Sequence, residues 1–369
     1  MVMVYSQLLD RPSINRMEEY LQGTEILRLL ELEELSSEDL YASLSDLEEI
    51  DFDRVEETLS KLFISIEKEK NSVIVDVTDT HFTGDSLDLK PRKGKEGRIK
   101  KLIQIALVVT ESRGFPLFHR VYPGNTMTMT IFSDLVKDPW LRGFNSIIVD
   151  RGMISPGKLE ELLEMNFVLI AGIRKSPELK RLIDTIPREE IYSKNGMIRL
   201  KNTFVYCMQI DYKGGKMIVV YNPPLESVKR PHFYENSSDK SIARYLGFSL
   251  IYHNKSLSTG EVMKKYYDKD TVKRAFKHMK GVLDLRPVRV WLESHIESHV
   301  KICYLSYATL NYLSFIMEKK GISGPEALDS LRTGYRVYLK DEKSGFMWES
   351  MVNMSDLQKK IMDVVFKRT

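Results

Sequence analysis

Cysteine is scarce in this chain of 369 residues, and its 2 cysteines, Cys207 and Cys303, lie far apart. Their spacing matches no zinc site or disulfide framework, so we expect reduced, buried thiols in a cytoplasmic protein. The first residues, MVMVYSQLLD, lack the basic segment and apolar run of a signal peptide. Long apolar runs are also missing, because polar side chains interrupt the longest candidate, residues 302–316, which predicts a core helix.

Charge of one sign does not dominate, since the formal net charge is only +3. Its distribution is uneven, however: residues 31–60 are acidic, whereas residues 90–101, KPRKGKEGRIKK, are strongly basic. A local basic run on a balanced chain indicates contact with a polyanion, and a solvated loop is the alternative. The composition, 43% apolar and 29% charged, is typical of a globular protein with a substantial core.

The spacing of apolar residues divides the chain into helical and β-rich parts. Residues 1–70 show helical periodicity, and the run SVIVDVTDT at 72–80 then predicts a β-strand. Further strands are expected at 102–114, 115–125, 146–150, 167–173 and 246–253, and helices at 127–141, 156–165 and 258–283. Alternating runs separated by Asn-Gly and Gly-Gly predict a small antiparallel sheet within 174–244. Helices are expected after residue 283.

We therefore predict an α/β fold, in which a mixed sheet flanked by helices is interrupted by an antiparallel β insert. We predict five domains. They are an N-terminal helical region (1–70), the first part of a core (71–173), a β-rich insertion (174–244), the last part of the core with the long helix and C-terminal helices (245–345), and a C-terminal tail helix (346–369).

Two aspartates lie where α/β proteins often place ligands and catalytic groups. Asp76 lies within an apolar strand, and Asp150 ends the strand SIIVD. A carboxylate in a buried strand is costly unless a cation compensates it, so the pair could hold one or two Mg²⁺ ions for phosphodiester chemistry. A helix cap or a partner for Arg151 is the alternative role, and Asp79 and Asp85 are further acids nearby.

Several segments, in this order, resemble the insertion-sequence-four-type DDE transposases. They are DVTDTHF beginning at Asp76, KEGR beginning at Lys95, FPLFHRVYPGNTMT, IIVDRGMIS, YYDKDTVKRAFKHMKGVLDLRPVRVW and IESHVKICYLSYATL. The resemblance covers roughly residues 70–340. It implies a ribonuclease-H-like fold in which Asp, Asp and Glu surround two divalent metals, Mg²⁺ or Mn²⁺.

The resemblance assigns the first acid to Asp76 and the second to Asp150. The third is expected within the pattern V-E-x-x-F-[RK]-x-x-K, and Lys273 occupies its position. A protonated lysine cannot bind a metal and repels Mg²⁺, and it can instead pair with the two aspartates in the metal's place. Asp270 is not expected to replace the missing glutamate, because it starts about 5 Å away along the helix axis.

The resemblance also implies double-stranded DNA, as transposon ends and target, for the partner, and a homodimer on that DNA. Phosphate contacts are expected from Lys93, Lys95, Arg98, Arg151, Arg274, Lys277, Lys280 and Arg286. A solvated helix face is the alternative for Lys277 and Lys280. No membrane is involved, and the expected location is the cytoplasm, at the nucleoid of a prokaryote.

The function implied is cut-and-paste transposition, with catalysis impaired by Lys273. A catalytically inactive DNA-binding protein derived from a transposase is the alternative. Family members commonly carry a longer helical DNA-recognition region ahead of the first acid, so we expect the helical region at 1–70 to be truncated.

Overall fold

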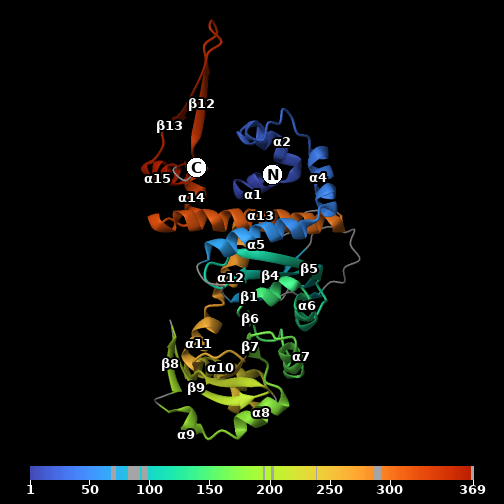
Figure 1. Cartoon of the computed structure of the whole chain (residues 1–369), viewed down its shortest axis with the longest axis vertical. Helices are drawn as coiled ribbons and strands as arrows, with labels where there is room; N and C mark the ends of the chain where they lie inside the picture. Colours follow the sequence, from blue (N-terminus) through green and yellow to red (C-terminus); the bar gives the residue numbers. More distant parts are fainter. Residues whose placement is uncertain are drawn as a thin grey trace.

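The computed structural model describes residues 1–67, 72–81, 92–93, 99–193, 196–200, 203–237, 239–283, 285 and 292–366. Helices from both ends of the chain gather at one pole of an elongated molecule, and the β-rich insert lies at the other (Figure 1). No helix in the described part of the chain combines the length and apolarity needed to cross a membrane.

Helices form the N-terminal part, as its periodicity predicts. They are α1 (Val2–Leu8), α2 (Ile14–Gln22), α3 (Ile26–Leu29), α4 (Ser37–Glu49) and α5 (Phe52–Ile66). Helix α4 begins with a capping box, in which Ser36 and Asp39 bond each other's backbone amides. Leu8 and Leu44 share a core cluster with Val300 of the long helix α13 (Glu293–Met317). The N-terminal helices therefore pack into the same core as the rest of the chain.

Nine of the described strands form one large mixed sheet. In spatial order they are β5 (Pro116–Pro123), β4 (Leu102–Thr110), β1 (Val73–His81), β6 (Ile147–Val149), β7 (Leu169–Ile173), β11 (Phe248–His253), β10 (Gly215–Tyr221), β9 (Thr203–Tyr212) and β8 (Met197–Leu200). Strands β1, β6 and β7 are parallel, and antiparallel strands extend the sheet on both sides. The predicted mixed sheet is confirmed. A short pair, β2 (Arg92–Lys93) and β3 (Ile99–Lys100), lies within the basic run.

Helices cover both faces of the sheet because its side chains alternate between two core clusters. Ile74 and Ile148 belong to the cluster that contains α11 (Thr259–Tyr267), α12 (Asp270–Lys277) and α13. Val75 and Val149 belong to the other cluster, which contains side chains of α6 (Thr128–Leu135), α7 (Leu159–Glu164) and α8 (Pro177–Asp184). The sheet is therefore the middle layer of three.

The sequence suggested that the insert forms a small sheet of its own, but it does not. Strands β8, β9 and β10 pair in sequence, and β10 pairs with β11, so the insert continues the main sheet. This happens because β11, FSLIYH, is almost entirely buried and can pair along both edges. Helices α9 (Arg188–Ile191) and α10 (Pro223–Asn236) complete the insert.

The helix expected at 258–283 is divided into α11, α12 and a π-helical turn, His278–Val282. Between α11 and α12, the Thr271 hydroxyl donates to the backbone carbonyl of Asp268 and competes with regular helical bonding. The apolar periodicity continues across the junction, which is why the sequence shows no break there.

The C-terminal part is not wholly helical, and this expectation was wrong. Beyond α14 (Gly324–Leu331), strands β12 (Tyr335–Lys340) and β13 (Met347–Val352) form a hairpin that projects from the body (Figure 1). The run YRVYLK alternates apolar and polar side chains, and Asp341 accepts backbone amides in the turn, where Gly345 has φ +69. Helix α15 (Asp356–Phe366) follows. The five domain boundaries remain predictions.

Candidate active site

The two aspartates lie side by side on the neighbouring interior strands β1 and β6, at the level where the parallel strands β6 and β7 end, which we call the sheet edge. Strands β1 and β6 run parallel with Val75 opposite Val149, so the next residues, Asp76 and Asp150, are adjacent across strands spaced about 4.8 Å apart. Both side chains follow Ile74 and Ile148 by two positions and therefore face the α11–α12 side. Each carboxylate accepts the following backbone amide, at 2.8 Å for Asp76 and 2.6 Å for Asp150.

A lysine reaches this pair of acids from the junction between α11 and α12. The Lys269 ammonium lies 2.6 Å from Asp150 Oδ1, and its side chain is only 12% exposed. The ammonium also lies 3.7 Å from the centre of the Tyr266 ring, whose hydroxyl is 3.4 Å from the same carboxylate oxygen. The charge of Lys269 acts on Asp76 as well. A cation of the protein itself therefore compensates the two aspartates.

Burial and charge compete at both partners of this ion pair. Burial raises the pKa of Asp150, but the charge and hydrogen bond of Lys269, the Arg151 amide and the charge of Lys273 outweigh it, so this pKa lies below its usual value. Burial also lowers the pKa of Lys269, and the attraction of Asp150 and Asp76 only partly offsets it. The carboxylate is thus held ionised beside a lysine that has lost most of its water.

Lys273, at the position of the expected third acid, lies near the site but does not form the pair that the sequence suggested. Its ammonium pairs with Asp270 at 3.3 Å, with the lysine side chain 53% exposed, while its charge still acts on Asp150. The ion pair comes from Lys269 instead, because the break between the helices directs that side chain toward the sheet edge. Within the described residues, no group of three Asp, Glu, His or Cys side chains could hold a metal.

The chemistry of this donor set does not fit a two-metal centre. Mg²⁺ and Mn²⁺ require several oxygen ligands, and the described site offers two carboxylates. One of these, Asp150, is in contact with the ammonium of Lys269, and Lys273 adds a second positive charge nearby. A divalent ion would have to displace Lys269 and then remain close to both lysines.

Two glycines allow large side chains to approach the sheet edge. Gly152, in the VDRG turn, has φ +99, and a Cβ added there would lie 2.6 Å from the Arg174 guanidinium. A Cβ at Gly172 of β7 would collide with the Tyr266 hydroxyl. Arg174 and Tyr266 therefore occupy space that any other residue at 152 or 172 would fill.

The predicted phosphate-contacting residues have different surroundings. Arg151, Arg274 and Lys277 are exposed, the last two on α12. Lys280 instead donates to Thr78 Oγ1 and to the Asp79 backbone carbonyl, both at 2.6 Å, and so joins the π-helical turn to β1. Lys93 is placed in β2, but its side chain lies outside the described part, as do residues Lys95, Arg98 and Arg286.

One cation near this edge was missed by the sequence analysis. Lys175 follows β7 and donates to the backbone carbonyls of Tyr245 and Phe248 at 2.7 and 3.1 Å. Burial, with the charges of Arg151, Lys229 and Lys180, lowers its pKa to about 8. The sequence did contain a signal for this residue, because two basic residues, Arg174 and Lys175, directly follow the predicted strand at 167–173.

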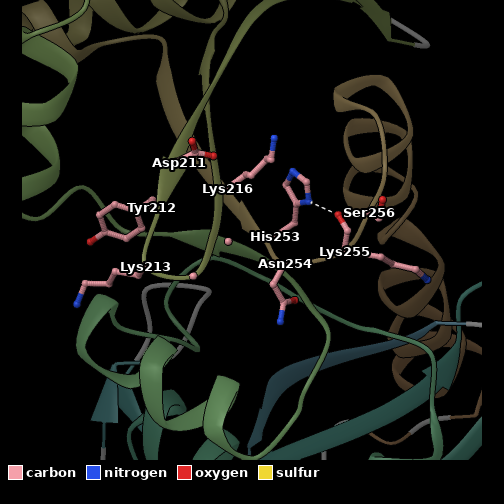
Figure 2. A pocket seen from close by; sticks show the side chains of 10 residues that line it. Asp211, Tyr212, Lys213, Lys216, His253, Asn254, Lys255 and Ser256 are labelled. Carbon is pink, nitrogen blue, oxygen red and sulfur yellow. Dashed lines mark hydrogen bonds between the residues drawn. The ribbon is translucent and has the colours of Figure 1, made fainter.

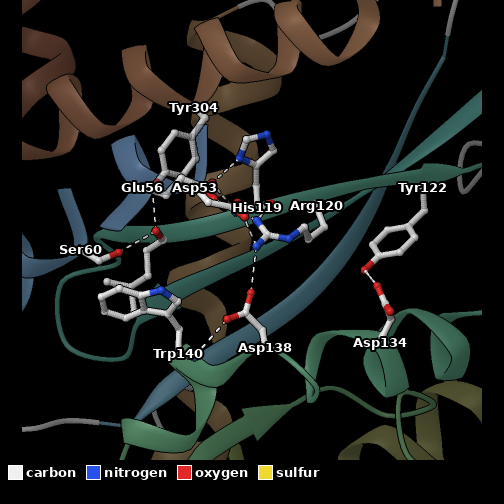
Figure 3. Close-up of polar contacts among 11 residues, drawn as sticks. Asp53, Glu56, Ser60, His119, Arg120, Tyr122, Asp134, Asp138, Trp140 and Tyr304 are labelled. Atoms are coloured by element: carbon white, nitrogen blue, oxygen red, sulfur yellow. Dashed lines mark hydrogen bonds and ion pairs between the residues drawn. The ribbon is translucent and has the colours of Figure 1, made fainter. Parts of the chain in front are cut away.

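His119 and Arg120, in the segment FPLFHRVYPGNTMT, stabilise the core and do not belong to the site. Buried Glu56 of α5 accepts hydrogen bonds from the His119 backbone amide at 2.8 Å and ring Nδ1 at 2.7 Å, and from Arg120 at 2.9 Å (Figure 3). Arg120 also pairs with Asp138 at 2.9 Å. This hydrogen-bond and ion-pair network links α5 to β5 and to the segment that precedes β6.

A cavity of about 690 Å³ lies apart from the aspartates, toward the amino end of β7. It lies beside the β9–β10 turn and the end of β11 and is lined by Lys213, Lys216 and His253 among others (Figure 2). His253 pairs with Ile170 near the amino end of β7, whereas Asp150 follows the carboxyl end of β6 and Asp76 lies beside it within β1. The cavity therefore opens at the opposite edge of the sheet.

Comparison with known proteins finds likenesses to transposases. Residues 67–235, which include both aspartates, match the family described as "Transposase DDE domain". Among solved structures, the chain resembles a piggyBac transposase, determined by cryo-EM as a synaptic complex with hairpin DNA. The TM-score is 0.51 at 12% identity, over 90% of this chain and 68% of that one. The expected ribonuclease-H-like fold class is confirmed. No curated protein matches the chain.

Proposed function

Because residues 67–235 match the family described as "Transposase DDE domain", we propose that the chain binds the ends of an insertion sequence as a transposase with impaired strand cleavage. In an intact site of this kind, a phosphodiester at the transposon end is hydrolysed, and the 3′-hydroxyl produced is joined to target DNA. The single observation that carries the proposed impairment is the 2.6 Å ion pair between Lys269 and Asp150.

The impairment follows from electrostatics at the carboxylates. An ion that approached Asp76 and Asp150 would have to break a partly buried ion pair and leave the Lys269 ammonium without its partner. Lys273 supplies a second charge where an anionic ligand is needed. The aspartates therefore retain their place at the sheet edge, but the lysines weaken the binding of the Mg²⁺ or Mn²⁺ that supplies the hydrolytic chemistry when bound.

DNA binding itself does not need this metal. Arg151 and Lys175 lie near the carboxyl ends of the parallel strands, and exposed Arg274 and Lys277 lie on α12. Such side chains bind phosphates without reading the base sequence, and the affinity they provide falls steeply with salt. We expect them to hold the DNA backbone across the edge that contains the aspartates.

A catalytically inactive DNA-binding protein derived from a transposase is the second candidate. The two lysines favour it, since they oppose the chemistry while leaving the basic surface intact. In either case we expect a homodimer on DNA that acts at the nucleoid in the cytoplasm. The solved piggyBac complex is described as synaptic, and such an assembly is part of the proposal here.

A nicking assay separates the two candidates. Supercoiled plasmid carrying the terminal repeats that flank the coding sequence is incubated with Mg²⁺ or Mn²⁺, and DNA binding is followed in parallel by mobility shift. We expect wild-type protein to bind DNA and nick it slowly, and Asp150→Asn to abolish the nicking. Complete absence of nicking with intact binding would establish the inactive protein. Nicking that survives Asp150→Asn unchanged would refute the site.

A further inference from the structure

The hairpin of β12 and β13 has the properties of a segment that lacks a partner (Figure 1). Within the described part of the chain its strands pair only with each other, so their outer edges keep unpaired backbone groups. An isolated two-stranded hairpin is marginally stable at best in water, and open strand edges readily accept another chain. A second surface that covers the hairpin would stabilise it.

The two faces of the hairpin differ in chemistry. Side chains of directly paired residues share a face, and alternate pairs lie on opposite faces. The side that we name the apolar face consists of Tyr335, Val337, Leu339, Trp348, Ser350 and Val352. Its large side chains are uncovered, with Tyr335 69%, Leu339 54% and Trp348 53% exposed. The charged strand residues lie on the other face.

The charged face is already in contact with the N-terminal helices. The Tyr338 hydroxyl donates to Glu25, and Arg336 pairs with the same carboxylate at 3.6 Å. Arg28 of α3 pairs with Glu349 at 3.5 Å and lies 4.3 Å from the centre of the Tyr338 ring. These contacts fix one face of the hairpin against the molecule and leave the apolar face directed outward.

We propose that the apolar face docks on the same face of a second copy of this chain, with the two hairpins antiparallel. This inference rests on the homodimer of the proposed function and names its surface. Along the face, the small pair Val337–Ser350 lies between the bulky Leu339–Trp348 pair and Tyr335. In an antiparallel arrangement the small pairs meet at the two-fold axis, so Trp348 faces the partner's Val352 and Leu339 faces the partner's Tyr335.

Charge argues for a second copy rather than nucleic acid. The apolar face carries no charged side chain, and residues 335–352 contain three basic and three acidic residues, so the hairpin as a whole does not attract phosphate. The exposed area of the apolar face sets the size of the contact. Two aromatic and three aliphatic side chains per copy bury on the order of 1,000 Å² in total, the lower end for a specific interface. We expect a weak dimer without DNA.

The oligomeric state of the full chain tests this surface. Sedimentation velocity over a concentration series, without DNA, should show reversible dimerisation by the wild type. Trp348→Ser should weaken the dimer by about 30-fold or more, because it removes the largest side chain of the apolar face. Met347→Ser is the matched control, since Met347 is 58% exposed on the neighbouring position but lies on the other face. The control should dimerise like the wild type.

Cysteine crosslinking tests the antiparallel geometry independently of affinity. Val337→Cys places a thiol next to the predicted two-fold axis, whereas Lys340→Cys places one on the opposite face. The natural thiols of Cys207 and Cys303 are buried, so they give little background. Mild oxidation should link two copies through residue 337 and not through residue 340.

Several results would overturn the proposal. They are a wild type that stays monomeric throughout the series, equal loss of dimer in Trp348→Ser and Met347→Ser, or equal crosslinking at 337 and 340. Binding of neutral phospholipid vesicles that is lost in Trp348→Ser would assign the face to lipid instead. Because these measurements contain no DNA or metal, their failure is separate from failure of the nicking assay. Circular dichroism confirms that each variant is folded.

Discussion

The Lys269 ammonium and the Asp150 carboxylate form a 2.6 Å ion pair at the carboxyl end of β6, where the lysine is 12% and the aspartate 36% exposed. Removal of one partner from a buried pair costs about 3–5 kcal/mol, because the other charge remains without its partner. The partial exposure of Asp150 reduces the expected cost through solvent screening. This pair therefore contributes to stability as well as opposing metal binding.

We predict that Asp150→Asn lowers the free energy of unfolding by about 1–2 kcal/mol at pH 7. Asp270→Asn is the control, because its pair with Lys273 is exposed and should contribute no more than about 0.5 kcal/mol. The difference between Asp150→Asn and wild type should shrink in acid. Folding lowers the pKa of Asp150, so the ionised carboxylate stabilises the folded protein at pH values above the pKa that this group has in the unfolded chain. This stabilisation is lost as the pH falls through the lower pKa of the folded protein. Urea unfolding at several pH values measures this, and equal effects of both substitutions would contradict it.

The sequence was sufficient to predict the sheet that places Asp76 and Asp150 next to each other, while their catalytic role stays a prediction. Apolar runs identified β1 and β6. Asp76 lies within the first run, and Asp150 directly follows the second. The sequence was not sufficient to identify Lys269, because its position depends on the break between α11 and α12, across which the apolar spacing continues. The β12–β13 hairpin was missed for a different reason, since its short alternating run was assigned to the surrounding helices.

Metal binding should improve when the lysines are replaced. We predict that Lys273→Glu binds Mn²⁺ more tightly than wild type, because a carboxylate replaces a repelling charge. Addition of Lys269→Gln should tighten binding further, since it frees Asp150. Titration calorimetry measures both, with Lys359→Glu on α15 as a control of equal charge change at a distance (Figure 1). Equal affinity in wild type and Lys273→Glu would refute the assignment of residue 273.

The turn after Asp150 should tolerate only glycine at position 152. Gly152→Ala combines a left-handed φ of +99 with a Cβ 2.6 Å from the Arg174 guanidinium, so we predict a loss of about 1–3 kcal/mol of unfolding free energy. Gly157→Ala, where a Cβ meets nothing within 4 Å, should change stability by no more than about 0.5 kcal/mol. Thermal or urea unfolding compares the two. Similar losses would show that the turn is not strained in this way.

Two lysines close together in the sequence should affect different properties. Lys277 is exposed, so Lys277→Met should leave stability unchanged and reduce the slope of log affinity against log salt by about 0.9 if it contacts a phosphate. Lys280→Met should instead lower the free energy of unfolding by about 1–2 kcal/mol, because two oxygen acceptors on β1 lose their donor. Anisotropy of a labelled duplex at several salt concentrations, with urea unfolding alongside, separates the two. A stable Lys280→Met with a reduced slope would restore that lysine to the DNA surface.

The pH dependence of DNA binding should reveal Lys175. Burial and the neighbouring charges of Arg151, Lys229 and Lys180 lower its pKa to about 8, so it is charged at pH 7 and largely neutral at pH 9. An ordinary lysine, with a pKa near 10.4, stays charged over that range. Since the charged form attracts phosphate, affinity for a labelled duplex should fall as pH rises from 7 to 9 at constant salt. Lys175→Gln should bind more weakly at pH 7 and lose this pH step, and a step that persists in Lys175→Gln would exclude this lysine as its origin.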